Sequence, residues 1–423
     1  MSRTLAVLFV SANTERLNMA TMPLGLGLVC AATRRAGHDA AFLDLLVEPD
    51  PSTAVSRAIA AFAPDVIGIS IRNIDDQCRD HPRFLLGPAR TLVQECRGLT
   101  CSPVVVGGAG YSIFPRAALS FLGADYGVAG DGEEVFPALL ESLASGAAVP
   151  DLPGLYTPER VPSLPRADCG ALDGQPAWDE ALGASIAPEV WVPIQGRRGC
   201  PNDCSYCSTS SIQGRTIRRR PPAEVAALVG RLGATGAARF YFVDNSFNIP
   251  ERHALELCAA LSALRPRPAW RCILYPERVS EELVAAMAGA GCVEASLGFE
   301  SGCKRILREM NKRFTPADVR RTSGLLARHG IRRMGFLLLG GPGETRESVE
   351  ESLAFAHSLA LDDLRVTVGI RIYPGTPLAG KARAEGVVAP GDDLLQPRFY
   401  LAPGLDGWIQ ERVAAAARED PVA

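Results

Sequence analysis

The hydrophobic positions in residues 1–145 predict a parallel sheet whose strands alternate with helices. Short continuous apolar runs, typical of strands buried on both faces, recur through this part of the chain. The expected strands cover residues 5–10, 40–45, 66–71, 104–106 and 126–128. Between them, apolar residues on one face indicate helices, for example from Pro23 to Gly37 and over 54–62. This alternation is typical of a doubly wound, Rossmann-like α/β domain.

A second series of the same kind is expected over residues 189–385. Its strands cover residues 190–194, 239–243, 270–274, 293–299, 334–339 and 367–372. Ser280 and Thr315 are suited to begin two of the intervening helices, because their hydroxyls can cap the free amides of a first turn. Six such units predict a partial (βα)6 barrel with functional residues at the carboxyl ends of its strands. The Pro- and Gly-rich stretch 146–188 is expected to be a linker, and residues 386–423 a short tail.

Composition narrows the class of protein. The 423 residues are 47% hydrophobic and carry a net charge of −3, which gives no electrostatic footprint for nucleic acid. The 12 cysteines are scattered apart from one group, so they do not suggest a disulfide framework. Neither a membrane span nor a signal peptide is expected, so the predicted location is the cytoplasm. The basic run Arg215–Arg220 has two interpretations, an exposed edge or a clamp for an anionic ligand.

The grouped cysteines carry the most specific chemistry in the chain. Cys200, Cys204 and Cys207 have the spacing C-x3-C-x2-C and follow the first expected barrel strand. A four-iron cluster normally takes four thiolates, so three would leave one iron free to bind a small molecule. Structural zinc requires four protein ligands, and the next cysteine in the chain is Cys258. The motif therefore predicts a [4Fe–4S] cluster with an open iron.

This motif resembles the cluster loop of the radical SAM family, in which an aromatic residue precedes the last cysteine, as Tyr206 does here. The resemblance implies that S-adenosylmethionine (SAM) binds the open iron and that an external reductant of flavodoxin or ferredoxin type supplies single electrons. Asp244, Asn245 and Glu300 also have a plain interpretation as turn and helix caps. The residues that the resemblance assigns to SAM binding are Tyr206, Asp244, Asn245, Glu300, Ser301, Gly340, Gly341, Pro342 and Gly343.

The first domain resembles the cobalamin-binding domain that precedes the radical SAM domain in one large subgroup. The residues that this resemblance assigns to cobalamin lie near the ends of the expected strands: Ser70, Arg72, Asn73, Gly107, Gly108, Ala109, Gly130, Gly132 and Glu133. Many such domains carry the motif D-x-H-x-x-G after the first strand, with the His bound to cobalt. The corresponding stretch here, Ser11–Leu17, has no His. We therefore expect either cobalamin without a His ligand or a degenerate domain that binds none.

The two resemblances together predict a cobalamin-dependent radical SAM C-methyltransferase that acts on a small molecule. Arg371 and Tyr373, at the end of the sixth barrel strand, are its predicted catalytic residues, with a rim position as the plain alternative. The nearest alternative function is a cyclisation or rearrangement that uses both cofactors without net methyl transfer. The methylthiotransferase branch would need three ordered cysteines in the first domain and a basic tail, and neither pattern occurs. An alternative of another class is a non-catalytic, cobalamin-binding regulatory protein.

Overall fold

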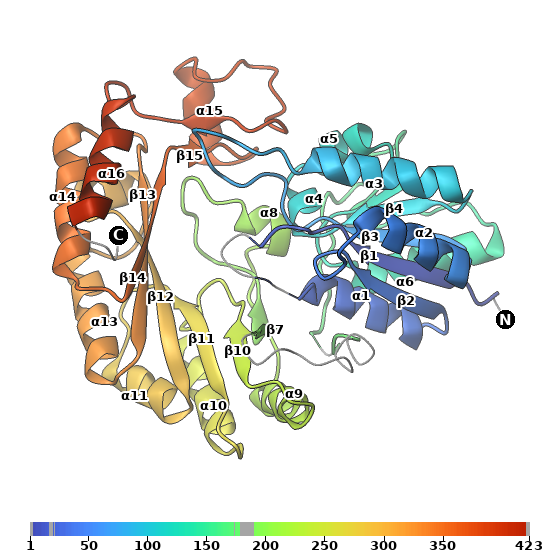
Figure 1. The fold of residues 1–423 in the computed structure, drawn as a ribbon, viewed down its shortest axis with the longest axis horizontal. Helices are drawn as coiled ribbons and strands as arrows, with labels where there is room; N and C mark the ends of the chain where they lie inside the picture. The colour runs from blue at the N-terminus through green and yellow to red at the C-terminus, as the bar shows by residue number, and fades with distance from the viewer. Residues whose placement is uncertain (1–2, 17–19, 21, 173, 178–189, 420–423) are drawn as a thin grey trace. The chain divides into compact units, whose positions relative to one another are not determined.

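The computed structural model describes residues 3–16, 20, 22–172, 174–177 and 190–419, which form two compact units (Figure 1). The chain passes between the units more than once. The first unit comprises Met1–Asp76, Arg83–Ile186 and Ser208–Arg218, and the second comprises Gln77–Pro82, Ala187–Cys207 and Arg219–Ala423. Among the helices that the structure describes, none combines the length and the apolar character needed to cross a bilayer.

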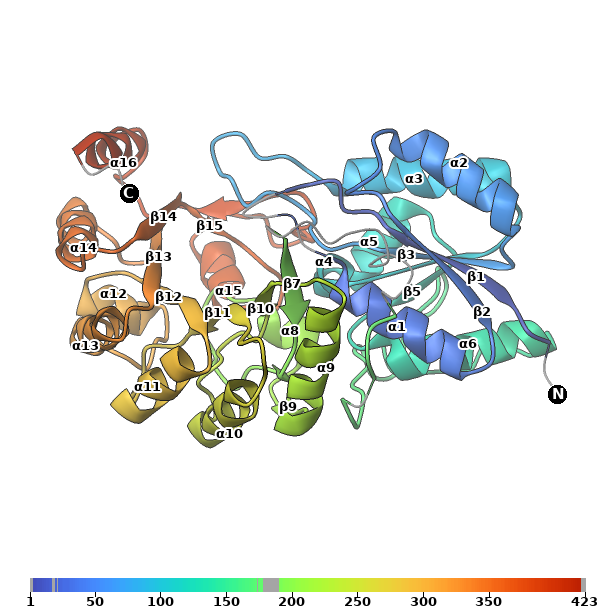
Figure 2. The same ribbon diagram turned by 60° about the horizontal axis from the view of Figure 1, so that its bottom comes forward.

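The first unit contains a six-stranded sheet in the order β2-β1-β3-β4-β5-β6, parallel except for the last strand. Its strands are β1 (Ala6–Ser11), β2 (Asp39–Asp44), β3 (Val66–Ser70), β4 (Val104–Gly107), β5 (Tyr126–Val128) and β6 (Leu155–Tyr156). Figure 2 shows helices on both faces of this sheet. On one face lie α1 (Leu24–Arg35) and α6 (Gly132–Ser145); on the other lie α2 (Pro51–Phe62), α3 (Leu86–Leu99) and α5 (Pro115–Leu122). The short helices of this unit are α4 (Ala109–Ile113) and α8 (Thr209–Gln213).

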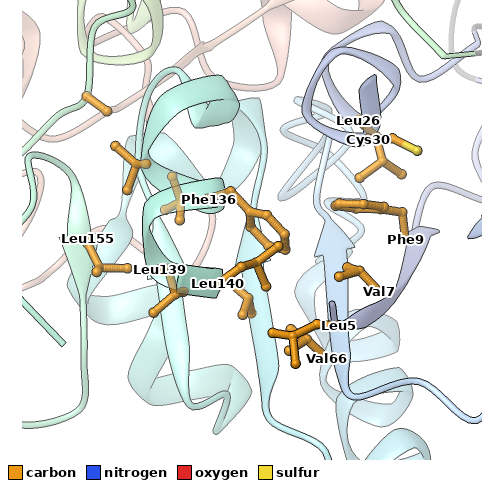
Figure 3. Packing of buried hydrophobic residues seen from close by; sticks show 14 residues of the cluster. Leu5, Val7, Phe9, Leu26, Cys30, Val66, Phe136, Leu139, Leu140 and Leu155 are labelled. Atoms are coloured by element: carbon orange, nitrogen blue, oxygen red, sulfur yellow. The ribbon is translucent and has the colours of Figure 1, made fainter. Parts of the chain in front are cut away.

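The core between the first sheet and its helices α1 and α6 explains why β1 reads as a continuous apolar run. Phe9 of β1 packs against Phe136 of α6 with ring centroids 5.2 Å apart, and both side chains are buried (Figure 3). Leu139 and Leu140 of α6 continue the same cluster. Strands of a parallel sheet that carries helices on both faces bury every side chain, which leaves no polar face to alternate with.

The second unit contains a six-stranded parallel sheet whose spatial order, β7-β10-β11-β12-β13-β14, is also the chain order. Its strands are β7 (Trp191–Ile194), β10 (Arg239–Phe242), β11 (Ala269–Leu274), β12 (Cys292–Glu300), β13 (Arg332–Leu339) and β14 (Asp363–Val368). The helices that connect or follow them are α9 (Pro222–Ala234), α10 (Glu251–Ser262), α11 (Glu281–Gly289), α12 (Lys304–Glu309), α13 (Pro316–Arg328), α14 (Arg346–Ser358), α15 (Pro377–Ala384) and α16 (Trp408–Glu419). Short strands are β8 (Arg197–Arg198), β9 (Arg218–Arg219), β15 (Ile370–Arg371) and β16 (Phe399–Tyr400).

The predicted fold class is confirmed, and helix caps explain part of the agreement. The Ser280 hydroxyl accepts a hydrogen bond from the Leu283 amide at 3.1 Å, and Thr315 forms a reciprocal capping box with Asp318. Two features differ from the sequence expectation. Residues expected as a linker include β6, and the strand expected over 367–372 is divided into β14 and β15 by Gly369, which has a φ of 78°.

Replacing Gly130 tests whether the tight turn after β5 requires glycine for the fold itself. Gly130 has a φ of 90°, and an added Cβ would overlap the carbonyl oxygen of Ala167. We expect Gly130→Ala to lower the free energy of unfolding by about 3 kcal/mol, from left-handed strain of about 1–2 kcal/mol together with overpacking. The matched control is Gly123→Ala, because Gly123 has a φ of 69° but open space around it. Urea unfolding measures the stability of both variants. Equal losses of unfolding free energy would contradict the packing argument.

Candidate active site

The three motif cysteines lie in the loop that follows β7, at the carboxyl end of the second sheet. Cys200 is buried, whereas Cys204 and Cys207 are partly buried. The Cys207 amide donates a hydrogen bond to the Cys204 carbonyl at 3.2 Å, which turns the backbone between these two thiols. All three thiols therefore belong to one short loop at the edge of the barrel where functional residues are expected.

A buried carboxylate fixes the start of this loop. Asp244, just after β10, accepts hydrogen bonds through Oδ1 from the amides of Gly196 (2.9 Å) and Arg197 (3.1 Å). The Arg197 guanidinium is buried too, and it donates to the carbonyl oxygens of Ser246 (3.0 Å from Nε) and Gly199 (2.6 Å). Burial raises the pKa of Asp244 to about 6, although the Arg197 charge opposes the rise. The end of one strand thereby holds the backbone that leads into Cys200.

The turn after α12 braces the middle of the cysteine loop. The Ser205 amide donates to the Met310 carbonyl at 3.0 Å, and the Asn311 side chain donates to the Asp203 carbonyl at 3.0 Å. Arg313 adds an exposed ion pair with Asp203 at 3.2 Å. Exposed pairs contribute little to stability, so the two backbone-directed hydrogen bonds are the stronger constraint.

Lys312, in the centre of this brace, is a residue that the sequence analysis missed. Its side chain is 5% exposed, and its Nζ lies 3.2 Å from Oε1 of Glu300. The ammonium also lies 5.3 Å from the ring centroid of Tyr206, the aromatic residue of the cysteine loop. Burial alone lowers the pKa of a lysine, but Tyr206, Glu300 and Cys204 together hold the pKa of Lys312 well above its usual value. The cysteine loop therefore has a buried cation beside it.

The donor set of the loop fits a four-iron cluster. Burial raises the pKa of the Cys200 and Cys204 thiols, and the Lys312 ammonium opposes this rise at both. Within the described residues, no three His, Cys, Asp or Glu side chains converge as a single metal ion would require. The thiolates of a four-iron cluster bind different irons, so three cysteines on one loop need not converge on a point.

In the first unit, the loops after β3 and β4 pack against each other through glycine backbone. The Ile71 amide donates to the Gly107 carbonyl at 2.8 Å, and the Gly110 amide donates to the Ile71 carbonyl at 3.0 Å. Gly108 has a φ of 101°, and a Cβ there would lie 2.6 Å from the Ile71 oxygen. The structure thus brings Ser70, Gly107 and Gly108 together at the carboxyl edge of the sheet. At least one reason for glycine at position 108 is this contact within the protein.

The loop after β5 lies at the same edge and is joined to β4 by Ser112. The Ser112 hydroxyl accepts from the Gly130 amide at 2.9 Å and donates to the Gly108 carbonyl at 2.8 Å. The remaining residues assigned to cobalamin follow these strands directly. Arg72 and Asn73 continue the loop after β3, Ala109 begins α4, and Gly132 and Glu133 begin α6.

The basic run of the sequence is partly used for internal contacts. Arg218 donates through its guanidinium to buried Asp131 and to the Cys169 carbonyl, the latter at 2.9 Å. Asp131 also accepts from the Cys169 amide at 2.9 Å. The Cys169 thiol lies 3.5 Å from Oε2 of Glu133. Arg218 and Asp131 therefore tie residues 208–218 to the start of α6, within the first unit.

The match to family models decides the family. The model of the Radical SAM superfamily matches residues 194–356, which contain all three cysteines and most of the second sheet. The model of the B12 binding domain matches residues 11–140, which contain the glycine loops of the first sheet. The chain belongs to the radical SAM proteins that carry a B12-binding domain.

Relatives match most of the chain, across both of its domains. It is 25% identical to a tryptophan 2-C-methyltransferase of Streptomyces laurentii, over 88% of this chain and 74% of the relative. It is 26% identical to a cytidylyl-2-hydroxyethylphosphonate methyltransferase of Streptomyces wedmorensis, over 94% of this chain and 85% of the relative. The fold is similar to that of TsrM from Kitasatospora setae, solved with cobalamin and a [4Fe–4S] cluster, with a TM-score of 0.84, 23% identity, and coverage of 99% and 88% of the two chains.

Within the radical SAM domain, the glycine loop after β13 is organised by Glu344. This buried carboxylate accepts hydrogen bonds through Oε2 from the amides of Gly340 and Gly341, the latter at 2.8 Å. Burial raises the pKa of Glu344 to about 7. Pro342 is buried in the turn and Gly343 is exposed, with the Arg305 side chain donating to its carbonyl at 2.6 Å. Sequence reasoning identified the glycines of this loop but not the carboxylate that shapes it.

Ser301, at the end of β12, has a structural use in the radical SAM domain. Its hydroxyl is 2.8 Å from that of Ser352 and accepts from the Cys303 amide at 3.1 Å, so it ties β12 to α12 and α14. Glu300 precedes it with a φ of 62° and pairs with Lys312, as described above. Asn245 is partly buried beside Asp244. Their proposed roles toward SAM stay predictions.

Arg371 and Tyr373 lie on the short segment after β14. The Arg371 guanidinium is buried and donates to the carbonyl oxygens of Ile372 (2.7 Å) and Leu394 (2.9 Å). It stacks 5.2 Å from the Tyr373 ring centroid. These contacts attach residues near Leu394 to the barrel, which gives Arg371 a structural use. The catalytic role of both residues stays a prediction.

The expected lack of a His ligand to cobalt stays a prediction, and the stretch that matches the B12-binding model contains two histidines, His38 and His81. His81 lies in the segment Gln77–Pro82, which belongs to the second unit, whereas His38 lies in the first unit. His38 is buried, and its Nδ1 accepts from the Leu5 amide at 3.2 Å, next to the start of β1. The glycine loops follow the ends of the strands, at the opposite edge of the sheet.

Glu344 gives a prediction about pH. Because its pKa in the folded protein is raised from 4.5 to about 7, wild type should lose stability relative to Glu344→Gln as the pH rises through that window. The difference in unfolding free energy between the two should change by at most about 3 kcal/mol between pH 4.5 and pH 8. Denaturant unfolding of cofactor-free protein measures it. Glu347→Gln, at an exposed position three residues later, is the control. Wild type should not lose stability relative to this variant over the same pH window. A flat difference for Glu344→Gln would overturn the assignment.

Proposed function

We propose that this protein is a cobalamin-dependent radical SAM methyltransferase that methylates an unactivated carbon of a small molecule. The observation that carries the proposal is the loop with three thiols at the carboxyl end of the barrel, in a chain that also has a B12-binding domain. Relatives named as methyltransferases match both domains together. This combination favours methyl transfer over a regulatory role without chemistry.

In this proposal, each group of residues has one task. Cys200, Cys204 and Cys207 each bind one iron, which leaves the fourth iron for the amino and carboxylate groups of SAM. When bound, the cluster would pass on one electron received from an external reductant, which would split SAM into methionine and a 5′-deoxyadenosyl radical, and cobalamin would carry the methyl group. The protein holds the cysteine loop through Asp244 and the turn after α12, and presents the glycine loop at Gly340 and Gly341 to SAM.

Three finer points belong to the same proposal. The electron comes from an external flavodoxin- or ferredoxin-type reductant, because none of the proposed cofactors is itself a source of electrons. Nucleic acid is not the substrate, since the net charge of −3 gives no basic footprint for it. The reducing cytoplasm is the compartment that suits free thiols and a cluster.

The ligand assignment predicts the iron content of variants. Cys204→Ala should reduce iron from about four per chain to a small residual fraction, because two thiolates hold a cluster poorly. Cys101→Ala is the control, since Cys101 is an exposed cysteine outside the motif. Iron and sulfide analysis after anaerobic reconstitution provides the measurement. Full iron in Cys204→Ala would refute this ligand set.

The reaction class is tested with labelled SAM. Anaerobic purification with cobalamin supplied should give about four irons and about one cobalt per chain. Incubation with methyl-labelled SAM, a one-electron reductant and candidate acceptors, beginning with tryptophan and cytidylyl-2-hydroxyethylphosphonate, should then place label on carbon. Cleavage of SAM with a rearranged, unlabelled product would instead establish the alternative reaction. Iron without cobalt would show a degenerate first domain and remove cobalamin from the proposal.

A further inference from the structure

Lys312 is a buried charge for which stability offers no explanation. Lysine is rarely buried without a specific partner, and a buried ion pair is often no more stable than an apolar pair of the same size. Yet the side chain is 5% exposed and its partner Glu300 is 13% exposed. A charge kept in such a place at the edge of a site is a candidate for an electrostatic role.

The surroundings of Lys312 aim its charge at the cysteine loop. Its Nζ lies 5.3 Å from the ring centroid of Tyr206, which stands between two of the proposed ligands. Two further rings, Tyr275 and Phe314, lie 5.9 and 5.8 Å from the same atom. Aromatic faces attract a cation while excluding water from it. Three rings and one carboxylate therefore fix the ammonium where solvent screening is weak.

The backbone around Lys312 prevents the charge from moving away from the loop. Its neighbour Asn311 donates to the Asp203 carbonyl at 3.0 Å, and Met310 accepts from the Ser205 amide at 3.0 Å. The Arg313 amide donates to the Tyr275 hydroxyl at 2.9 Å, so the ring beside the ammonium is held by the next residue of the same turn. The turn and the cysteine loop thus form one braced structure with the cation inside it.

A fixed cation beside an iron–sulfur cluster has a definite electrostatic effect. Reduction adds one negative charge to the cluster, and a nearby positive charge stabilises that state more than the oxidised state. Cluster potentials respond to net charge and to exposure in this way. Glu300 carries the opposite charge 3.2 Å from the ammonium and partly cancels its field. Removing either partner should therefore shift the cluster potential, in opposite directions.

We propose that Lys312 is a positioning residue that raises the reduction potential of the cluster held by the cysteine loop, with Glu300 as the counter-charge that limits the rise. The inference rests on the proposed function for the presence of the cluster, but not for methyl transfer. It makes the ease of reduction a property that this chain sets through two residues outside the cysteine motif.

The decisive comparison is made in a background without Glu300. Removing Lys312 alone would leave a buried carboxylate that could take up a proton and hide the effect. We therefore compare Glu300→Gln with the double variant Glu300→Gln/Lys312→Met, because Met has a similar length and no charge. Iron and sulfide are counted first, and the cluster midpoint is then measured by a redox titration followed by electron paramagnetic resonance, without SAM.

The expected midpoints run in a fixed order. Glu300→Gln should lie above wild type. Adding Lys312→Met should lower the midpoint by at least about 59 mV, a tenfold change in the ratio of reduced to oxidised cluster. Glu300→Gln/Lys312→Arg, which keeps the charge, should stay close to Glu300→Gln. If Lys312 had only a structural role, the Arg and Met double variants would both disturb the loop. Their midpoints would then be similar to each other and different from that of Glu300→Gln.

Equal midpoints for Glu300→Gln and the double variant, each with full iron, would overturn the proposal. If the double variant does not retain its iron, wild type against Glu300→Gln decides: a higher midpoint supports the role of the charge pair, and an unchanged one overturns it. Wild type without iron after reconstitution is a different result. It contradicts the proposed function, and it is seen in the iron count before any titration begins.

Discussion

The contact on which the site depends most is the acceptance of two backbone amides by the buried carboxylate of Asp244. This contact joins the end of β10 to the residues that precede Cys200. The neighbouring Arg197 guanidinium is buried as well and donates hydrogen bonds to backbone carbonyls. Removing one partner from such a network leaves an uncompensated buried charge, which is far more destabilising than losing an exposed hydrogen bond. Asp244 and Arg197 therefore fix the start of the cysteine loop to the end of the second sheet.

A second charged pair acts on the middle of the same loop. Lys312 pairs with Glu300 at the end of β12 and lies over the ring of Tyr206 in the cysteine loop. The turn that carries Lys312 also holds Asp203 and Ser205. The loop is thus supported at its start by one buried carboxylate and at its centre by one buried ammonium. Three thiolates concentrate negative charge when they bind irons. A scaffold that places cations nearby offsets part of that charge without supplying a fourth ligand.

The sequence predicted the repeated strand–helix units and the compact cysteine motif. Continuous apolar runs such as that of β1, caps such as Thr315 and the spacing of the three cysteines are local patterns with one physical cause each. Lys312 could not be recognised, because a single lysine after a short helix looks like an exposed residue until the fold brings Tyr206 and Glu300 to it. Asp244 had two interpretations of equal weight, since the same residue types cap turns and bind ligands. Contacts between distant segments, such as Arg371 with Leu394, have no signature in sequence.

The path of the chain at Cys207 has a consequence for any attempt to separate the domains. The next residue, Ser208, begins a segment that belongs to the first unit, where α8 packs near α4 and Arg218 pairs with Asp131. A fragment cut at residue 189 would carry this segment away from its partners while keeping it joined to the last cysteine ligand. Exchange of the B12-binding domain between relatives would likewise require residues 208–218 to be exchanged with it. Because the segments of the two units alternate along the chain, no single cut separates one unit from the other.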